Sequence, residues 1–109
     1  MAWHGKKWEN DVLSRAPQAH ILVGEKIFKP ENADLVACKS YGGKYTTHSD
    51  RYLYYKKGLW IHVYVPQSGI DVTSTKVEIL EPFVVSQTLF WWGMEDKIQR
   101  LGLPVLEEI

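Results

Sequence analysis

The strongest constraint on the fold is a pair of β-prone runs in the middle of the chain. Residues 51–55 and 59–65 are rich in aromatic and β-branched side chains, and Lys56-Lys57-Gly58 lies between them. A short loop with a glycine that can adopt a left-handed conformation is typical of a β-hairpin. The sequence therefore predicts an antiparallel hairpin. Its loop has three residues, 56–58, or only two, 57–58, and the sequence leaves this choice open.

Further elements are predicted on both sides of this hairpin. Apolar runs predict strands at residues 19–28 (with a turn or bulge at Gly24), 35–41 and 72–80, and a return strand at 44–48 after Gly42-Gly43. Apolar residues at helical spacing predict helices over residues 6–16 and 87–101. Ser86 is expected to cap the second helix and Gly102 to end it.

These elements predict one α+β domain covering residues 1–109. It contains an antiparallel sheet of about five or six hairpin-connected strands, flanked by an N-terminal and a C-terminal helix. The core is expected on the side of the hairpin that carries the odd-numbered residues of 59–65, which we call the odd row. Two residues of the next strand and the apolar side of the C-terminal helix are expected to pack over it. These residues are Leu59, Ile61, Val63, Val65, Val77, Ile79, Phe90, Met94 and Ile98.

Composition limits the compartment and the class of protein. Cys38 is the only cysteine, so no intramolecular disulfide can form, and a small secreted disulfide scaffold is excluded. The longest nearly uncharged apolar stretch, residues 82–94, is too short to span a bilayer, and the N-terminus lacks the apolar run of a signal peptide. We therefore expect a cytoplasmic protein that does not contact a membrane.

The charges are unevenly distributed, although the formal net charge is zero. Residues 39–57 carry five Lys or Arg against one Asp, whereas residues 58–109 carry three Lys or Arg against seven Asp or Glu. All six tyrosines lie between Tyr41 and Tyr64, so they fall mostly within the positive stretch. Aromatic and cationic side chains together are typical of surfaces that bind proteins or single-stranded nucleic acid.

Because side chains alternate along a strand, the even-numbered residues of 59–65, which we call the even row, lie on a surface away from the predicted core. A three-residue loop adds Tyr52 and Tyr54 to that surface, and a two-residue loop adds Arg51, Leu53 and Tyr55 instead. In either case Trp60 and Tyr64 are expected to be accessible. The candidate partner-binding residues are Arg51, Tyr52, Tyr54, Lys56, Lys57, Trp60, His62 and Tyr64.

This surface predicts a small, non-enzymatic binding protein of the inhibitor, immunity or accessory-factor type, with a protein partner. The first alternative is a module that binds RNA or single-stranded DNA through the same residues. Coverage by a helix would instead make the surface a second core. The adjacent Trp91 and Trp92 also suggest a homodimer, because one of the two rings must leave the core stripe of the helix.

Evidence for catalysis is limited to one segment. Ser49-Asp50-Arg51, followed by Leu53-Tyr54, resembles a segment of the barnase-type microbial ribonucleases, and this resemblance implies phosphate binding by Arg51. A ribonuclease-like enzyme that uses His48 or His62 with Arg51 is therefore the second alternative. Residues 36–39, where that family would place its catalytic Glu, contain no carboxylate. No catalytic residue, metal ligand or cofactor is assigned, because the histidines lack paired ligand spacing.

Overall fold

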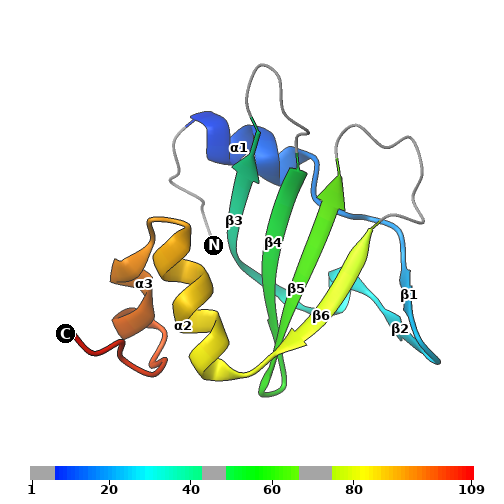
Figure 1. Cartoon of the computed structure of the whole chain (residues 1–109). Coiled ribbons are helices and arrows are strands. Elements are labelled where there is room, and N and C mark those ends of the chain that lie inside the picture. The colour runs from blue at the N-terminus through cyan, green and yellow to red at the C-terminus, as the bar shows by residue number, and fades with distance from the viewer. Residues whose placement is uncertain (1–6, 43–48, 67–74) are drawn as a thin grey trace.

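The computed structural model describes residues 7–42, 49–66 and 75–109 (Figure 1). The elements, in chain order, are α1 (Lys7–Ser14), β1 (Ile21–Val23), β2 (Lys26–Phe28), the 3-10 turn η1 (Pro30–Asn32), β3 (Asp34–Tyr41), β4 (Ser49–Lys56), β5 (Leu59–Pro66), β6 (Lys76–Leu80), α2 (Pro82–Trp91) and α3 (Glu95–Arg100). The predicted α+β class with antiparallel strands between terminal helices is confirmed. The predicted return strand at 44–48 lies outside the described residues.

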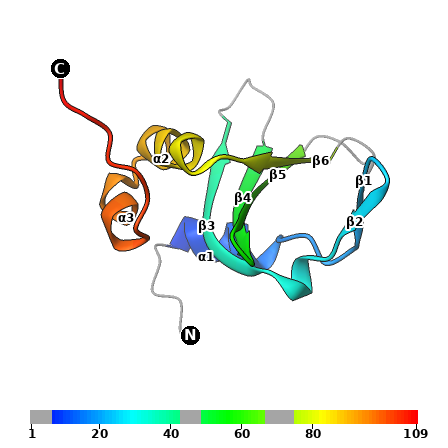
Figure 2. The same ribbon diagram turned by 90° about the horizontal axis from the view of Figure 1, so that it is seen from below.

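The strands form two antiparallel sheets. β3, β4, β5 and β6 make the main sheet in that order, and β1 pairs with β2 around Gly24, whose φ of 62° is left-handed. Figure 2 shows the main sheet curving, with α1 on one side of it and α2 and α3 on the other. We call these two sides the α1 face and the helical face. No helix within the described ranges is long and apolar enough to cross a membrane.

The turn between β4 and β5 has two residues. Lys56 pairs with Leu59, and the two residues between them have left-handed φ values, 48° at Lys57 and 83° at Gly58. This is the mirror-image turn whose twist matches that of the flanking strands. Of the two loops left open by the sequence, the shorter one is therefore observed, and it fixes which tyrosines share a face with Trp60.

Each face of the sheet carries a buried core, and this explains the main difference from the predicted core. The helical face carries Trp60, Leu89 and Trp92 with their neighbours, and the α1 face carries Tyr52 and Val63 with theirs. The C-terminal helices were expected over the odd row of β5, but they cover the even row. Because each row is apolar enough to be buried, alternation alone did not identify the face on which these helices pack. Among the predicted core residues, three are exposed: Leu59, Ile79 and Phe90.

The predicted C-terminal helix is two helices. Gly93 has a φ of 74°, and the Met94 N–H donates to the Leu89 carbonyl oxygen at 2.8 Å, which ends α2 in a Schellman motif. Gly102, with a φ of 67°, ends α3 in the same way, as expected. Ser86 is not a cap, because α2 begins at Pro82. Its hydroxyl instead donates to the Pro104 carbonyl oxygen at 2.6 Å and ties the C-terminal segment to α2.

Candidate binding surface on the helical face

Strand register places three cationic side chains in one row on the helical face. Lys39 pairs with Arg51, Arg51 with Tyr64, and Tyr64 with Lys76, so the row crosses all four strands of the main sheet. Tyr41 lies two residues beyond Lys39 on β3 and therefore on the same face. We call these five residues the cationic row. The row lies near the end of α2, since the Tyr41 hydroxyl donates to the Trp91 carbonyl oxygen at 3.2 Å.

Arg51 is held between two aromatic rings. Its guanidinium carbon lies 5.2 Å from the ring centroid of Tyr41 and 5.0 Å from that of Tyr64. The ammonium nitrogen of Lys39 also lies 6.0 Å from the Tyr41 centroid. Cations within about 6 Å of a ring centroid are attracted by the negative face of the ring. Arg51 is therefore oriented by stacking, which leaves its charge at a partly exposed position.

His62 lies beside the cationic row and is almost completely buried, with 8% of its surface exposed. Its neighbours across the strands are Leu53 and Glu78, and its ring centroid lies 6.0 Å from that of Trp92. Burial lowers the pKa of His62, the charge of Arg51 lowers it further, and Glu78 acts in the opposite direction. The imidazole is therefore neutral at neutral pH.

Two buried nitrogens on this face have no hydrogen-bond partner among the described residues. They are Nε of Arg51 and Nε2 of His62. Buried polar atoms are nearly always paired in folded proteins, so two such atoms on neighbouring strands of one face are uncommon. Hydrogen bonding of buried polar atoms in this region of the helical face is therefore less complete than in the rest of the described interior.

The predicted partner-binding residues do not form one surface. With the two-residue turn, Tyr52 and Tyr54 lie on the α1 face and are buried there, so their assignment to the surface of Trp60 was wrong. Trp60 was expected to be accessible, but α2 and the C-terminal segment cover it and 8% remains exposed. Lys56 and Lys57 lie at the β4–β5 turn, at the other end of the strands from the cationic row. The cationic row keeps Arg51 and Tyr64 of the predicted set.

Three members of the cationic row were not among the candidates: Lys39, Tyr41 and Lys76. Their positions follow from the pairing of β3 and β6 with the central hairpin, which depends on long-range register and not on local sequence. Once the turn length is known, strand alternation places Arg51 beside Tyr64. The charge excess of residues 39–57 was the sequence signal that pointed to this region.

The segment that resembles a ribonuclease has a structural role at Asp50. Asp50 lies within β4 and is completely buried on the α1 face. Arg15 donates to both of its carboxylate oxygens, from Nε at 2.9 Å and Nη2 at 3.2 Å. On the same face the Tyr52 hydroxyl donates to the Val12 carbonyl oxygen at 2.7 Å. These bonds join α1 to the sheet, while His48 lies outside the described residues.

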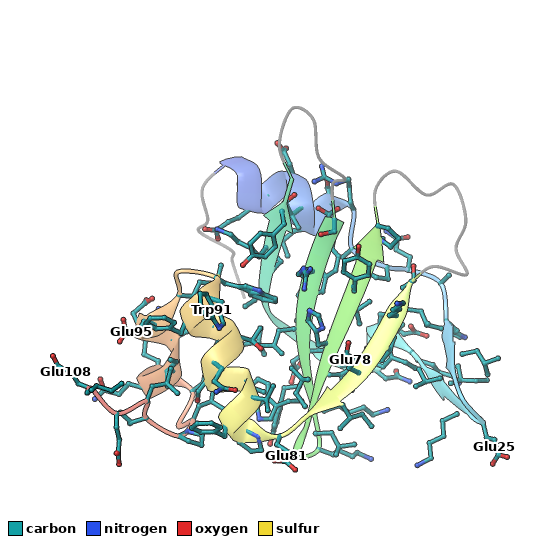
Figure 3. The ribbon with its side chains drawn as sticks, in the orientation of Figure 1. Glu25, Glu78, Glu81, Trp91, Glu95 and Glu108 are labelled. Carbon is teal, nitrogen blue, oxygen red and sulfur yellow. The ribbon has the colours of Figure 1, made fainter. Side chains whose placement is uncertain are left out.

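The two adjacent tryptophans have different environments. Trp92 belongs to the core of the helical face, with 4% exposed, so it is not available to a partner. Trp91, labelled on α2 in Figure 3, is 76% exposed. The α2 helix ends one residue before Trp92, whose ring can therefore turn inward while that of Trp91 remains outside.

Other reactive groups in the described part of the chain do not form a centre. No three His, Cys, Asp or Glu residues there lie close enough to hold a metal ion. Cys38 is buried on the α1 face, and burial raises the pKa of its thiol to about 11, which keeps it protonated and unreactive. Comparison of the chain with protein-family models, with curated proteins and with solved structures found no match.

Proposed function

We propose that the protein is a non-enzymatic binding module that contacts an acidic surface of a partner protein through the cationic row. The observation that carries this proposal is the position of Arg51 between the rings of Tyr41 and Tyr64. An inhibitor, an immunity protein or an accessory factor would use such a surface. The single buried cysteine is compatible with action in the cytoplasm.

A stacked arginine suits this role for a physical reason. Its side chain is already ordered, so less conformational entropy is lost when a carboxylate binds to it. Lys39 and Lys76 extend the positive charge along the row, whereas Glu78 is an acidic neighbour on β6. Tyrosine, tryptophan and arginine carry most of the binding energy in many protein interfaces. The exposed Trp91 at the end of α2 adds an apolar contact beside Tyr41.

The same geometry favours a protein partner over single-stranded nucleic acid. Nucleic-acid modules stack bases on open aromatic faces, and here the guanidinium group of Arg51 lies over both tyrosine rings. Trp60, which the sequence suggested as a stacking platform, is covered by the C-terminal helices. The formal net charge of zero also gives little general attraction for a polyanion.

A photocrosslinking experiment tests the proposal. A benzophenone amino acid replaces Lys76, which is exposed at one end of the cationic row, or Ile27, an exposed control residue on β2. Cells that produce each variant are irradiated, and the extract is divided into samples with and without nuclease. We expect a discrete protein adduct from position 76 that resists nuclease and does not form from position 27.

A charge-reversal variant makes this result specific. Lys39→Glu combined with the crosslinker at position 76 should reduce the adduct several-fold, because an acidic partner would then meet a like charge. Lys26→Glu on β2 is the matched control and should leave the adduct unchanged. An adduct that disappears with nuclease would support the nucleic-acid alternative, and identical adducts from positions 76 and 27 would contradict both.

A further inference from the structure

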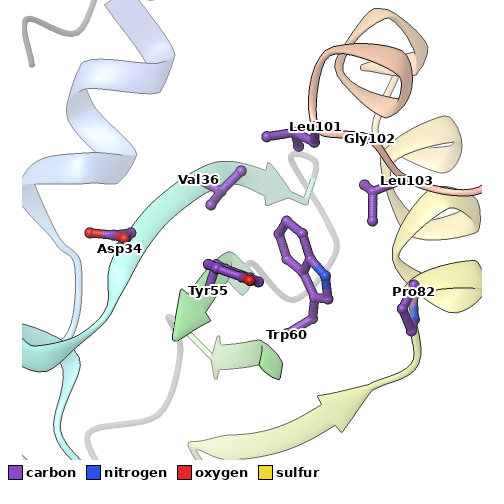
Figure 4. Close-up of a pocket in the computed structure, with 8 residues that line it drawn as sticks. All are labelled: Asp34, Val36, Tyr55, Trp60, Pro82, Leu101, Gly102 and Leu103. Atoms are coloured by element: carbon purple, nitrogen blue, oxygen red, sulfur yellow. The ribbon is translucent and has the colours of Figure 1, made fainter. Parts of the chain in front are cut away.

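A pocket lies on the helical face near the β4–β5 turn, at the other end of the strands from the cationic row. It is open to solvent and has a volume of about 470 Å³, which is within the usual range of roughly 300–1,000 Å³ for small-ligand sites. Figure 4 shows that the sheet forms one wall and the C-terminal segment the other. The residues that line this pocket are different from those of the cationic row.

The sheet wall consists of one row of paired residues. Asp34 pairs with Tyr55, and Tyr55 pairs with Trp60, so a carboxylate, a phenol ring and an indole ring follow one another across three strands. The two ring centroids lie 4.8 Å apart and the ring planes are inclined by 55°. Tyr55 remains 36% exposed, and Figure 4 shows its ring beside Trp60, with the carboxylate of Asp34 at the outer edge of the wall and directed away from the two rings. The wall therefore combines aromatic surface with a negative charge.

The opposite wall is apolar and held in place. Pro82 begins α2, and Leu101 and Leu103 flank Gly102 at the end of α3. A Cβ atom added at Gly102 would meet no atom within 4 Å, so this part of the chain borders open space. The hydrogen bond from Ser86 to Pro104 fixes the segment that follows. The pocket is thus formed before any ligand arrives.

This combination of walls points to a cation that carries alkyl groups. Aromatic faces attract cations, and quaternary ammonium groups are recognised by aromatic side chains in this way. Asp34 is the charged residue that lines the pocket. An ammonium group also lies along the β3 wall, since Lys97 Nζ donates to the Val36 carbonyl oxygen at 3.4 Å, so a bound cation is better placed at the Asp34–Tyr55 end.

We propose that this pocket binds an alkylated ammonium group, such as a methylated lysine side chain or the headgroup of a small quaternary amine. The nitrogen and its methyl groups would lie against Tyr55 at the Asp34 end of the pocket, and the rest of the ligand would run along the apolar wall. An anionic ligand would meet the carboxylate of Asp34, and a neutral alkyl group would gain nothing from it.

A titration of the full chain, followed by the NMR signal of the Trp60 indole N–H, tests this proposal. The probes are trimethyllysine, unmethylated lysine and 2-amino-7,7-dimethyloctanoic acid, the neutral analogue in which carbon replaces the quaternary nitrogen. We expect trimethyllysine to bind about tenfold more tightly than the neutral analogue, which has the same shape without the charge. Equal binding of these two probes, or no shift of the Trp60 signal at millimolar trimethyllysine, would overturn the proposal.

Variants at Tyr55 and Asp34 separate the contributions of the aromatic ring and of the negative charge to ligand binding. Tyr55→Leu removes the exposed ring and should weaken binding about tenfold, whereas Tyr55→Phe keeps a ring and should retain it. Asp34→Asn should weaken binding about fivefold, because one partly screened charge is lost. Asp11→Asn on α1 makes the same chemical change at another exposed site and should have no effect. Equal losses in Asp34→Asn and Asp11→Asn would contradict a specific site.

Two further probes identify the source of the ligand. If a peptide with trimethyllysine binds at least about tenfold more tightly than the free amino acid, the pocket reads a modified protein side chain. If choline and free trimethyllysine bind as tightly as the peptide, the ligand is a small quaternary amine. Either result supports the alkylammonium site.

Discussion

The two faces of the main sheet differ in how their buried polar groups are satisfied. On the α1 face, the buried Asp50 receives two bonds from Arg15, and the Tyr52 hydroxyl donates to the backbone of α1. On the helical face, nitrogens of Arg51 and His62 are buried without hydrogen-bond partners in the described ranges 7–42, 49–66 and 75–109. Unsatisfied buried groups destabilise a fold, so they persist where something other than stability is selected. The comparison therefore assigns the attachment of α1 to one face, and the other is the face on which we propose that ligands bind.

The largest expected effect on stability concerns the α1 face. Arg15→Ala removes the two bonds that Arg15 donates to the buried carboxylate of Asp50, and we expect the free energy of unfolding to fall by about 3 kcal/mol. Arg100→Ala is the control, because its ion pair with Asp96 is exposed and should contribute less than about 0.5 kcal/mol. Urea denaturation measures both. Similar losses in the two variants would show that the Arg15–Asp50 pair does not hold this face.

The next effect is a pH dependence that originates on the helical face. Because the pKa of His62 is lowered in the folded state, the unfolded chain takes up a proton first as the pH falls. The contribution of a neutral His62 to the free energy of unfolding is complete above about pH 6.5. It falls by up to about 1.4 kcal/mol per pH unit as the pH decreases toward the lowered pKa of the folded state.

Urea denaturation between pH 7 and pH 5 measures this slope. We expect His62→Gln to flatten it, because the titrating group is gone. If the parent protein and His62→Gln lose stability in parallel, the acid sensitivity of the fold does not come from His62.

The smallest effect on stability is expected at Trp91. Its ring is mostly exposed, so Trp91→Lys should change the free energy of unfolding by no more than about 0.5 kcal/mol. If two copies associate through α2, the same substitution should give a folded monomer in light scattering. A parent protein that is already monomeric at high concentration would contradict the homodimer and leave Trp91 to another partner.

The parts of the fold that sequence could predict depend on local signals. Glycine and alternation identified the central hairpin, and Gly102 identified the end of α3. The turn length was left open because the two-residue turn requires a left-handed lysine at position 57, a conformation that few residues other than glycine adopt. Gly93 was not recognised as a helix end, because apolar residues continue on both sides of it.

The candidate site was harder to predict because it depends on distant residues. Nothing local indicates that Arg15 pairs with a residue 35 positions away, or that Lys39 and Lys76 lie in one row with Arg51. The face covered by the C-terminal helices was also not determined by pattern, since both rows of β5 are apolar. Trp60 and Ile61 are adjacent, both are buried, and each belongs to a different core.

The two-residue turn at Lys57-Gly58 has a consequence for the order of assembly. The entropy lost when a loop closes costs about 0.6 kcal/mol more for each doubling of its length, and the 35-residue separation of Arg15 and Asp50 is about four doublings longer than this turn. We therefore expect β4 and β5 to pair early and α1 to dock late. Until α1 docks, we expect the carboxylate of Asp50 to remain hydrated. Late docking of α1 would bring Arg15 and the burial of this carboxylate together, which avoids a buried charge that still lacks its arginine.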